Sequence, residues 1–132
     1  MRALRLTYAD AQEMFRRMVF NVAVRNQDDH TKNISFLMGE DGKWRLSPAY
    51  DMGYAFNPDG SWTSQHQMSV NGKFDGITRA DLLAFASANS IKDASEVIDQ
   101  VCEAAIHWPD MVRNVGVPEE MVKGIVGNMV RI

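Results

Sequence analysis

The sequence has 132 residues and a formal net charge of −3, from 14 basic and 17 acidic side chains. Hydrophobic residues make up 45% and charged residues 23%, which is typical of a soluble globular protein, and we expect a single domain over residues 1–132. The charge balance argues against a broad phosphate-binding surface, so no direct nucleic-acid binding is expected. The single cysteine, Cys102, excludes an intramolecular disulfide and a CxxC zinc site. Because no apolar run reaches the length of a transmembrane helix and the N-terminus lacks a signal-peptide core, we expect a cytoplasmic protein with no membrane contact.

The first predicted element is an amphipathic helix over residues 8–25. Its apolar residues recur at spacings of three and four, which places them on one face of a helix. Thr7 and Asp10 stand at its start in the Thr-x-x-Asp arrangement of a capping box. Residues 26–33 are all polar and are predicted to form a loop, because eight consecutive polar residues do not build a core.

A β-hairpin is predicted after this loop. Residues 34–38 and 44–46 have strand character, and the Asp41-Gly42 pair between them is typical of a hairpin turn. Only one hairpin is visible in the sequence, so a large sheet is excluded. The predicted fold class is therefore mainly α with a small β-hairpin (α+β).

The remaining chain is predicted to be one long loop followed by helices. Residues 54–77 are rich in Gly, Asn, Ser and Asp and show no periodicity, and we expect them to be a mobile loop with a tight turn at 70–73. Three further helices are indicated by start signals at Thr78, Asp93 and Pro118, and Pro109 is expected to kink or end the second of them.

The polar residues that can support chemistry are concentrated between Asn26 and Asp51. The two ends of a hairpin lie side by side, so the loop that holds Asp28 and Asn33 is expected to meet Asp51 in one pocket. Asp28 can accept a hydroxyl proton, while an amide oxygen and a carboxylate can bind a hard cation such as Mg²⁺. Such a cation holds phosphate oxygens during phosphoryl transfer, and the Asp-x-x-x-x-Asn spacing followed by Asp51-Met52-Gly53 is similar to the catalytic loop and D-F-G triplet of protein kinases.

The sequence resembles the C-terminal part of the HipA family of bacterial serine/threonine kinases, the toxins of toxin–antitoxin modules. The matching segments are NQDDHTKNISF (26–36), WRLSPAYDMG (44–53) and HQMSVNGKFDGITRADLLAFA (66–86). The resemblance covers about residues 10–110 and implies the C-lobe of a protein-kinase-like HipA fold. It also implies Mg²⁺ and ATP as cofactors, a protein substrate, and a HipB-like antitoxin with a helix-turn-helix as partner.

The resemblance further implies a role for six residues. Asp28 corresponds to the catalytic base, and Asn33 and Asp51 correspond to the metal ligands. The residues that correspond to the phosphate side of the nucleotide site are His30, Lys32 and Tyr50, beside Asn33 and Asp51.

The sequence departs from a complete kinase in its N-terminal part. It contains neither GxGxxG nor GxxxxGK[ST], and residues 1–25 are too few for an ATP-clamping lobe. We therefore expect a C-lobe fragment that is inactive alone, because positioning supplies much of the rate of phosphoryl transfer. The apolar surface left without that lobe would favour a homodimer of the fragment.

Two other functions fit the residues themselves. A non-catalytic domain would bind a partner chain through its helices, and then Lys32 would be a solvated surface residue and Tyr50 a packing residue. A metal-dependent phosphoesterase would hold two cations and would need no N-terminal lobe. The side chains available for those cations are Asp28, Asp29, His30 and Asp51.

Three further polar or reactive residues are given no functional role. Asp29 receives none from the resemblance. His66 is too distant in sequence from the other histidines to suggest a metal pair, and a surface or core position is expected. Cys102 lies on a helical stripe and is expected to be a small buried hydrophobic residue.

Overall fold

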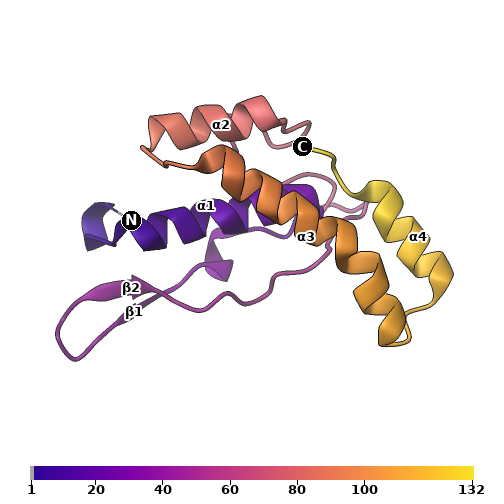
Figure 1. Ribbon diagram of the computed structural model, residues 1–132, viewed down its shortest axis with the longest axis horizontal. Coiled ribbons are helices and arrows are strands. Elements are labelled where there is room, and N and C mark those ends of the chain that lie inside the picture. Colours follow the sequence, from indigo (N-terminus) through magenta and orange to yellow (C-terminus); the bar gives the residue numbers. More distant parts are fainter. Residues whose placement is uncertain (1) are drawn as a thin grey trace.

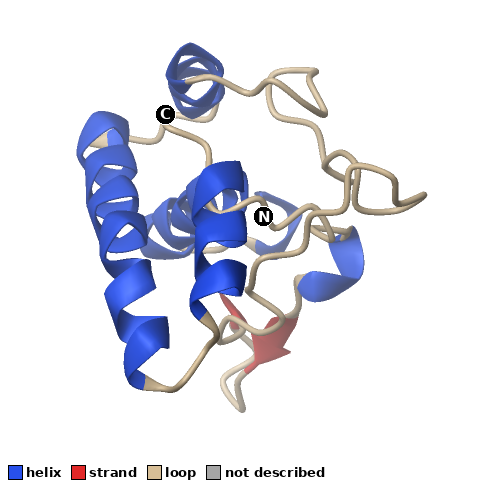
Figure 2. Cartoon of the chain, turned by 90° about the vertical axis from the view of Figure 1, so that its right-hand side faces the viewer, coloured by secondary structure: helices blue, strands red, loops and turns tan. Residues whose placement is uncertain are grey.

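The computed structural model describes residues 2–132 (Figure 1). This part of the chain forms α1 (Tyr8–Ala23), α2 (Arg79–Ala88), α3 (Ala94–Asn114), α4 (Glu119–Asn128), strands β1 (Phe36–Met38) and β2 (Trp44–Leu46), and the short 3-10 turns η1 (Arg2–Leu4) and η2 (Thr31–Asn33). The predicted class, mainly α with a small hairpin, is confirmed. α1 lies between the hairpin and the pair α2 and α3, and the two strands lie at the edge of the helical part (Figures 1 and 2). Across residues 2–132, no helix combines the length and apolar character needed to cross a membrane.

The start of α1 is fixed by the predicted capping box. The Thr7 amide donates to Asp10 Oδ2 at 3.0 Å, and the Asp10 amide donates to Thr7 Oγ1 at 3.2 Å. The second carboxylate oxygen, Oδ1, accepts from the Leu46 amide at 3.1 Å, which ties the end of β2 to α1. The hydrogen bond from the Thr7 side chain, followed by that from the Leu46 amide, lowers the pKa of Asp10 below its usual 3.8. The hydrogen bonds to ionised Asp10 therefore stabilise the fold fully at pH values above 3.8. This stabilisation is lost as the pH falls through the lowered pKa.

The core is formed mainly where α1 packs on α3 and α2. Phe15 and Val19 of α1, Leu82 of α2 and Ile98 of α3 are almost completely buried. The Phe15 ring stacks on that of Phe85, with 6.5 Å between their centroids. The apolar stripe that predicted α1 is therefore the face that builds the core.

The hairpin has the predicted turn and a short ladder. β1 and β2 are antiparallel, with Phe36 opposite Leu46 and Met38 opposite Trp44. Gly42 has a φ of +73°, the left-handed conformation that the Asp-Gly pair predicts. β2 has the predicted bounds, whereas β1 begins at Phe36, two residues later than predicted. The backbone oxygen of Ser35 still accepts from the Ser47 amide at 3.0 Å beyond the ladder.

The segment 54–77 has no regular secondary structure but is held at several points. His66, Val70 and Ile77 are buried, so the middle and the end of the segment pack on the helical core. The tight turn predicted at 70–73 is confirmed by reciprocal backbone hydrogen bonds of 2.9 Å between its first and last residues. The prediction of a loop is confirmed, and its mobility stays a prediction.

The C-terminal helices differ from the sequence prediction at their ends. α3 does not end at Pro109 but continues to Asn114, with the proline inside the helix. Asp93 precedes α3 in a left-handed conformation, and its side chain makes no capping bond. Pro118 is the residue before the first turn of α4, one position earlier than predicted.

The burial of α3 leads to a stability prediction. We expect Ile98→Val to lower the free energy of unfolding by about 0.5–1.5 kcal/mol, since a fully buried methylene is removed. Ile106→Val removes the same group from the same helix at a position that is 73% exposed. This control is expected to change the free energy of unfolding by less than about 0.5 kcal/mol. Urea denaturation of both variants measures the difference, and equal losses would contradict the observed packing of α3.

Candidate functional site

The polar loop after α1 runs as an extended chain in which side chains alternate in direction. Gln27 and Asp29 are buried, at 1% and 9% exposure, whereas the side chains of Asp28 and His30 are 47% and 40% exposed. Extended backbone places successive side chains on opposite sides. Asp28 and His30 therefore face solvent, and Gln27 and Asp29 face the rest of the protein.

The η2 turn brings Asn33 back beside Asp28. The Asn33 amide nitrogen Nδ2 donates to the backbone oxygen of Asp28 at 2.9 Å, and its backbone N–H donates to the His30 oxygen at 3.0 Å. The first of these bonds fixes the orientation of the side-chain amide. Within residues 2–132 its oxygen, Oδ1, accepts no hydrogen bond, so it remains available to a ligand.

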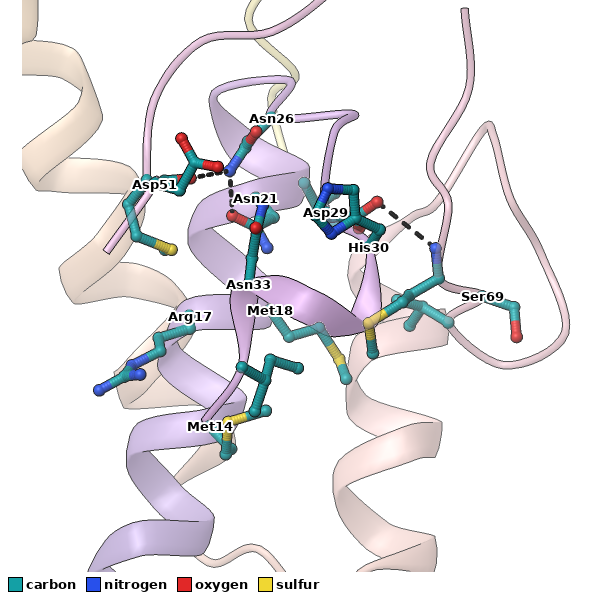
Figure 3. Close-up of a pocket in the computed structure, with 15 residues that line it drawn as sticks. Met14, Arg17, Met18, Asn21, Asn26, Asp29, His30, Asn33, Asp51 and Ser69 are labelled. Atoms are coloured by element: carbon teal, nitrogen blue, oxygen red, sulfur yellow. Dashed lines mark hydrogen bonds between the residues drawn. The ribbon is translucent and has the colours of Figure 1, made fainter. Parts of the chain in front are cut away.

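Asp51 is placed by Asn26, which follows the end of α1. The Asn26 side-chain nitrogen donates both to the Asp51 backbone oxygen at 3.3 Å and to Asn21 Oδ1 at 2.9 Å (Figure 3). Asp51 has a φ of +56°, a left-handed conformation that Asp tolerates better than most residues. Its carboxylate accepts no hydrogen bond from residues 2–132.

Asn33 and Asp51 line the same cavity, whose volume is about 50 Å³. Figure 3 shows Asp51, Asn26, Asn21 and Asn33 gathered at one end of this cavity, with Met14 and Met18 farther along α1. The cavity is therefore polar at one end and lined by methionine side chains at the other. The sequence prediction that Asn33 meets Asp51 across the hairpin agrees with this geometry.

Asp28 lies in a neighbouring cavity rather than in the same one. That cavity has a volume of about 280 Å³, and His30 is the residue that lines both. The expectation of one shared pocket is wrong in this respect, because the alternation of the extended loop turns Asp28 away from Asn33 and Asp51. The residues around the second cavity are Asp28, His30, Thr31, Lys32, Trp62 and Gln67.

His30 lies between these cavities with an unused ring nitrogen. Its Nε2 atom is 3.8 Å from Asp28 Oδ1. Its Nδ1 atom is buried and has no hydrogen-bond partner among residues 2–132. An unpartnered buried polar atom beside two cavities indicates a place where a polar ligand group would be stabilised.

Lys32 and Tyr50 are linked by a backbone contact. The Tyr50 hydroxyl donates to the Lys32 backbone oxygen at 2.8 Å, which braces the η2 turn against the chain that follows β2. The Lys32 side chain lines the cavity that contains Asp28. The structural contribution of Tyr50 is thus to hold the turn that carries Asn33.

No motif or spacing in the sequence indicates the buried polar pair of the site, Asp29 and His66. His66 Nδ1 lies 2.9 Å from Asp29 Oδ2, with side-chain exposures of 4% and 9%. The backbone N–H of Gln67 donates to the other oxygen of Asp29 at 2.7 Å. Because Asp29 and His66 are 37 positions apart, no local spacing reveals their contact.

The donor atoms of the first cavity fit a magnesium ion. Carboxylate and amide oxygens are the ligands that Mg²⁺ takes from proteins, usually one or two together with water and phosphate oxygens. Asn33 Oδ1 and the Asp51 carboxylate have this chemistry and have no other partner in the described chain. The side chains considered for the two cations of a phosphoesterase are not all free in this way, because Asp29 is hydrogen-bonded to His66. Among residues 2–132, no group of three His, Cys, Asp or Glu side chains is arranged to hold a metal ion.

Comparison with known proteins identifies the family. The model of the HipA-like C-terminal domain matches residues 1–129, nearly the whole chain. No significant match was found among the curated proteins or among the solved structures. The match covers the polar loop, the hairpin, Asp51 and the four helices together. The chain belongs to the family of HipA-like C-terminal domains.

Proposed function

We propose that this chain is the C-lobe of a HipA-like serine/threonine kinase, which transfers the γ-phosphoryl group of ATP to a protein hydroxyl. The observation that supports this proposal best is the pair of neighbouring cavities joined at His30. One cavity presents the oxygens of Asn33 and Asp51, and the other presents the Asp28 carboxylate. A phosphoryl donor on one side and a hydroxyl acceptor on the other would meet at His30.

In this proposal Asp28 receives the proton of the acceptor hydroxyl. The hydroxyl oxygen forms a bond to the γ-phosphorus, the bond from that phosphorus to the β–γ bridging oxygen breaks, and ADP leaves with its electron pair. Asp28 suits this role because its side chain is half exposed and lines the second cavity, which we call the acceptor cavity.

Asn33 and Asp51 would hold Mg²⁺ through the amide oxygen and the carboxylate. The ion, when bound, neutralises charge on the phosphate oxygens. His30 would donate a hydrogen bond to a phosphoryl oxygen, and Lys32 would supply positive charge from the acceptor side. Tyr50 would act indirectly by fixing the turn that orients Asn33.

The partners follow from the family. We propose association with a HipB-type antitoxin, together with a protein substrate that carries the acceptor serine or threonine. ATP would be bound in the full-length context, in which an additional lobe supplies the phosphate clamp that this sequence lacks. The isolated chain is then inactive, since Asp28 alone does not position the nucleotide.

A transfer assay tests the proposal. The full-length protein is incubated with Mg²⁺ and ATP labelled at the γ-phosphate, and the labelled amino acid is identified after hydrolysis. We expect phosphoserine or phosphothreonine, with no transfer when EDTA removes the metal. Release of free phosphate without any labelled protein, under conditions in which the nucleotide binds, would contradict the kinase assignment.

A further inference from the structure

The Asp29 carboxylate is almost entirely enclosed by residues 66–68. Its Oδ2 atom faces His66 Nδ1 at 2.9 Å, and its Oδ1 atom accepts from the backbone N–H groups of Gln67 at 2.7 Å and Met68 at 3.4 Å. A carboxylate only accepts hydrogen bonds, so His66 Nδ1 carries the proton. Asp29, which follows Asp28 in the sequence, thus holds residues 66–68 in place through these buried hydrogen bonds.

Gln27, the other inward-facing residue of the loop, makes a second connection to the same segment. Its backbone N–H donates to the Ala55 oxygen at 2.9 Å. Its side-chain nitrogen, in the orientation that gives both ends of the amide a partner, donates to the Thr63 oxygen at 2.9 Å. Gln27 and Asp29 therefore hold residues 55–68 against the loop, while Asp28 between them stays exposed.

The acceptor cavity depends on these connections because its walls come from both segments. Asp28, His30 and Lys32 form one wall, and Trp62 and Gln67 form the other. The Gln67 side chain donates to the Trp62 backbone oxygen, which links the residue bound by Asp29 to the tryptophan. Trp62 is 75% exposed and lines this cavity, and aromatic residues are enriched where proteins bind one another.

We propose that Asp29 is a positioning residue that builds the acceptor side of the site. Its carboxylate, through His66 and Gln67, holds Trp62 opposite Asp28, and Trp62 contacts an apolar side chain next to the acceptor hydroxyl. This inference rests on the proposed kinase function and adds to it a substrate class. The acceptor is a serine or threonine in a protein segment with a neighbouring apolar residue.

The test uses the full-length protein and two serine peptides that differ only in a leucine or a lysine next to the serine. We expect wild type to prefer the leucine peptide by about tenfold in kcat/KM, the range that one buried apolar side chain supplies. Trp62→Ala and Asp29→Ala should each remove this preference by raising the peptide KM. In Trp62→Ala the KM for ATP should stay within about twofold, because Trp62 lines the acceptor cavity and not the first cavity. The double variant should be no worse than either single variant, because both changes act through the same wall.

A conservative variant and a control variant distinguish a positioning role of Asp29 from a general loss of folded structure. His66→Asn keeps a nitrogen donor near the place of Nδ1 and should therefore retain most of the preference for the leucine peptide. Lys73→Met removes an ion pair of 2.8 Å with Asp81 of α2. Neither residue lines the acceptor cavity, so this control should leave the preference unchanged. Amide hydrogen exchange of Gln67 and Met68 should rise in Asp29→Ala and stay near wild type in the control.

The outcomes distinguish this inference from the function on which it rests. If wild type transfers phosphate to neither peptide nor any protein, the kinase proposal fails. If wild type transfers phosphate but the leucine preference persists in Trp62→Ala or in Asp29→Ala, the positioning role of Asp29 is wrong.

Discussion

Asp28→Asn is expected to lower the rate of phosphoryl transfer by about 10²–10⁴-fold, the range found when a general base is removed. The substitution keeps the size of the side chain and removes its ability to take a proton. The fold should be unaffected, because the Asp28 side chain is half exposed and its contact with His30 Nε2, at 3.8 Å, is longer than a hydrogen bond. The backbone oxygen that orients Asn33 is also unchanged. Rates are measured with saturating ATP and the full-length protein.

Asp59→Asn is the matched control for this experiment. Asp59 lies in an exposed part of the segment 54–77, where the hydrogen bond to Asn57 is made by its backbone N–H and not by its carboxylate. Its rate should equal that of wild type. A wild-type rate for Asp28→Asn would refute the assignment of the base while leaving the family membership intact.

Asp51→Asn is expected to weaken divalent-ion binding by about 10–100-fold or more, since even residues outside the ligand shell cost that much in metal affinity. Asparagine tolerates the left-handed conformation of Asp51, with its φ of +56°, so the backbone should keep its course. The bond from Asn26 reaches the backbone oxygen and is also retained. The substitution thus removes a charge from the site without removing its support.

The affinity is measured by titrating the 132-residue chain with Mn²⁺, a paramagnetic substitute for Mg²⁺ that broadens nearby amide signals. Asp75→Asn, which changes an exposed carboxylate of the same long loop, serves as the control. Its titration should match that of wild type. Equal weakening in both variants would mean that Mn²⁺ responds to overall charge and not to a site at Asp51.

Local features of the structure could be predicted from the sequence because their causes are local. The capping box of Thr7 and Asp10 and the turn at Gly42 depend on residues within a few positions of one another. The approach of Asn33 to Asp51 was also accessible, because a hairpin returns the chain to its starting point. The predicted hairpin therefore brings the two oxygen donors of the first cavity together.

Contacts between distant segments could not be predicted in this way. Asp29 reaches His66 across 37 positions, and Asp10 uses its second oxygen for the Leu46 amide, 36 positions away. In the sequence, nothing distinguishes either aspartate from one whose carboxylate is exposed to solvent. The same limit explains why Asp28 was expected in the cavity of Asn33, since the inward turn of Asp29 decides which way Asp28 faces.

The position of Mn²⁺ on the wild-type chain tests the proposed phosphotransfer site most directly. In a residue-resolved titration, the amide signals of residues 33 and 51 should lose intensity first, at Mn²⁺ concentrations that leave those of exposed acidic residues such as Asp59 and Glu103 unchanged. Broadening that begins at such exposed carboxylates, with residues 33 and 51 unaffected, would contradict a metal site between Asn33 and Asp51 and the transfer chemistry proposed for it.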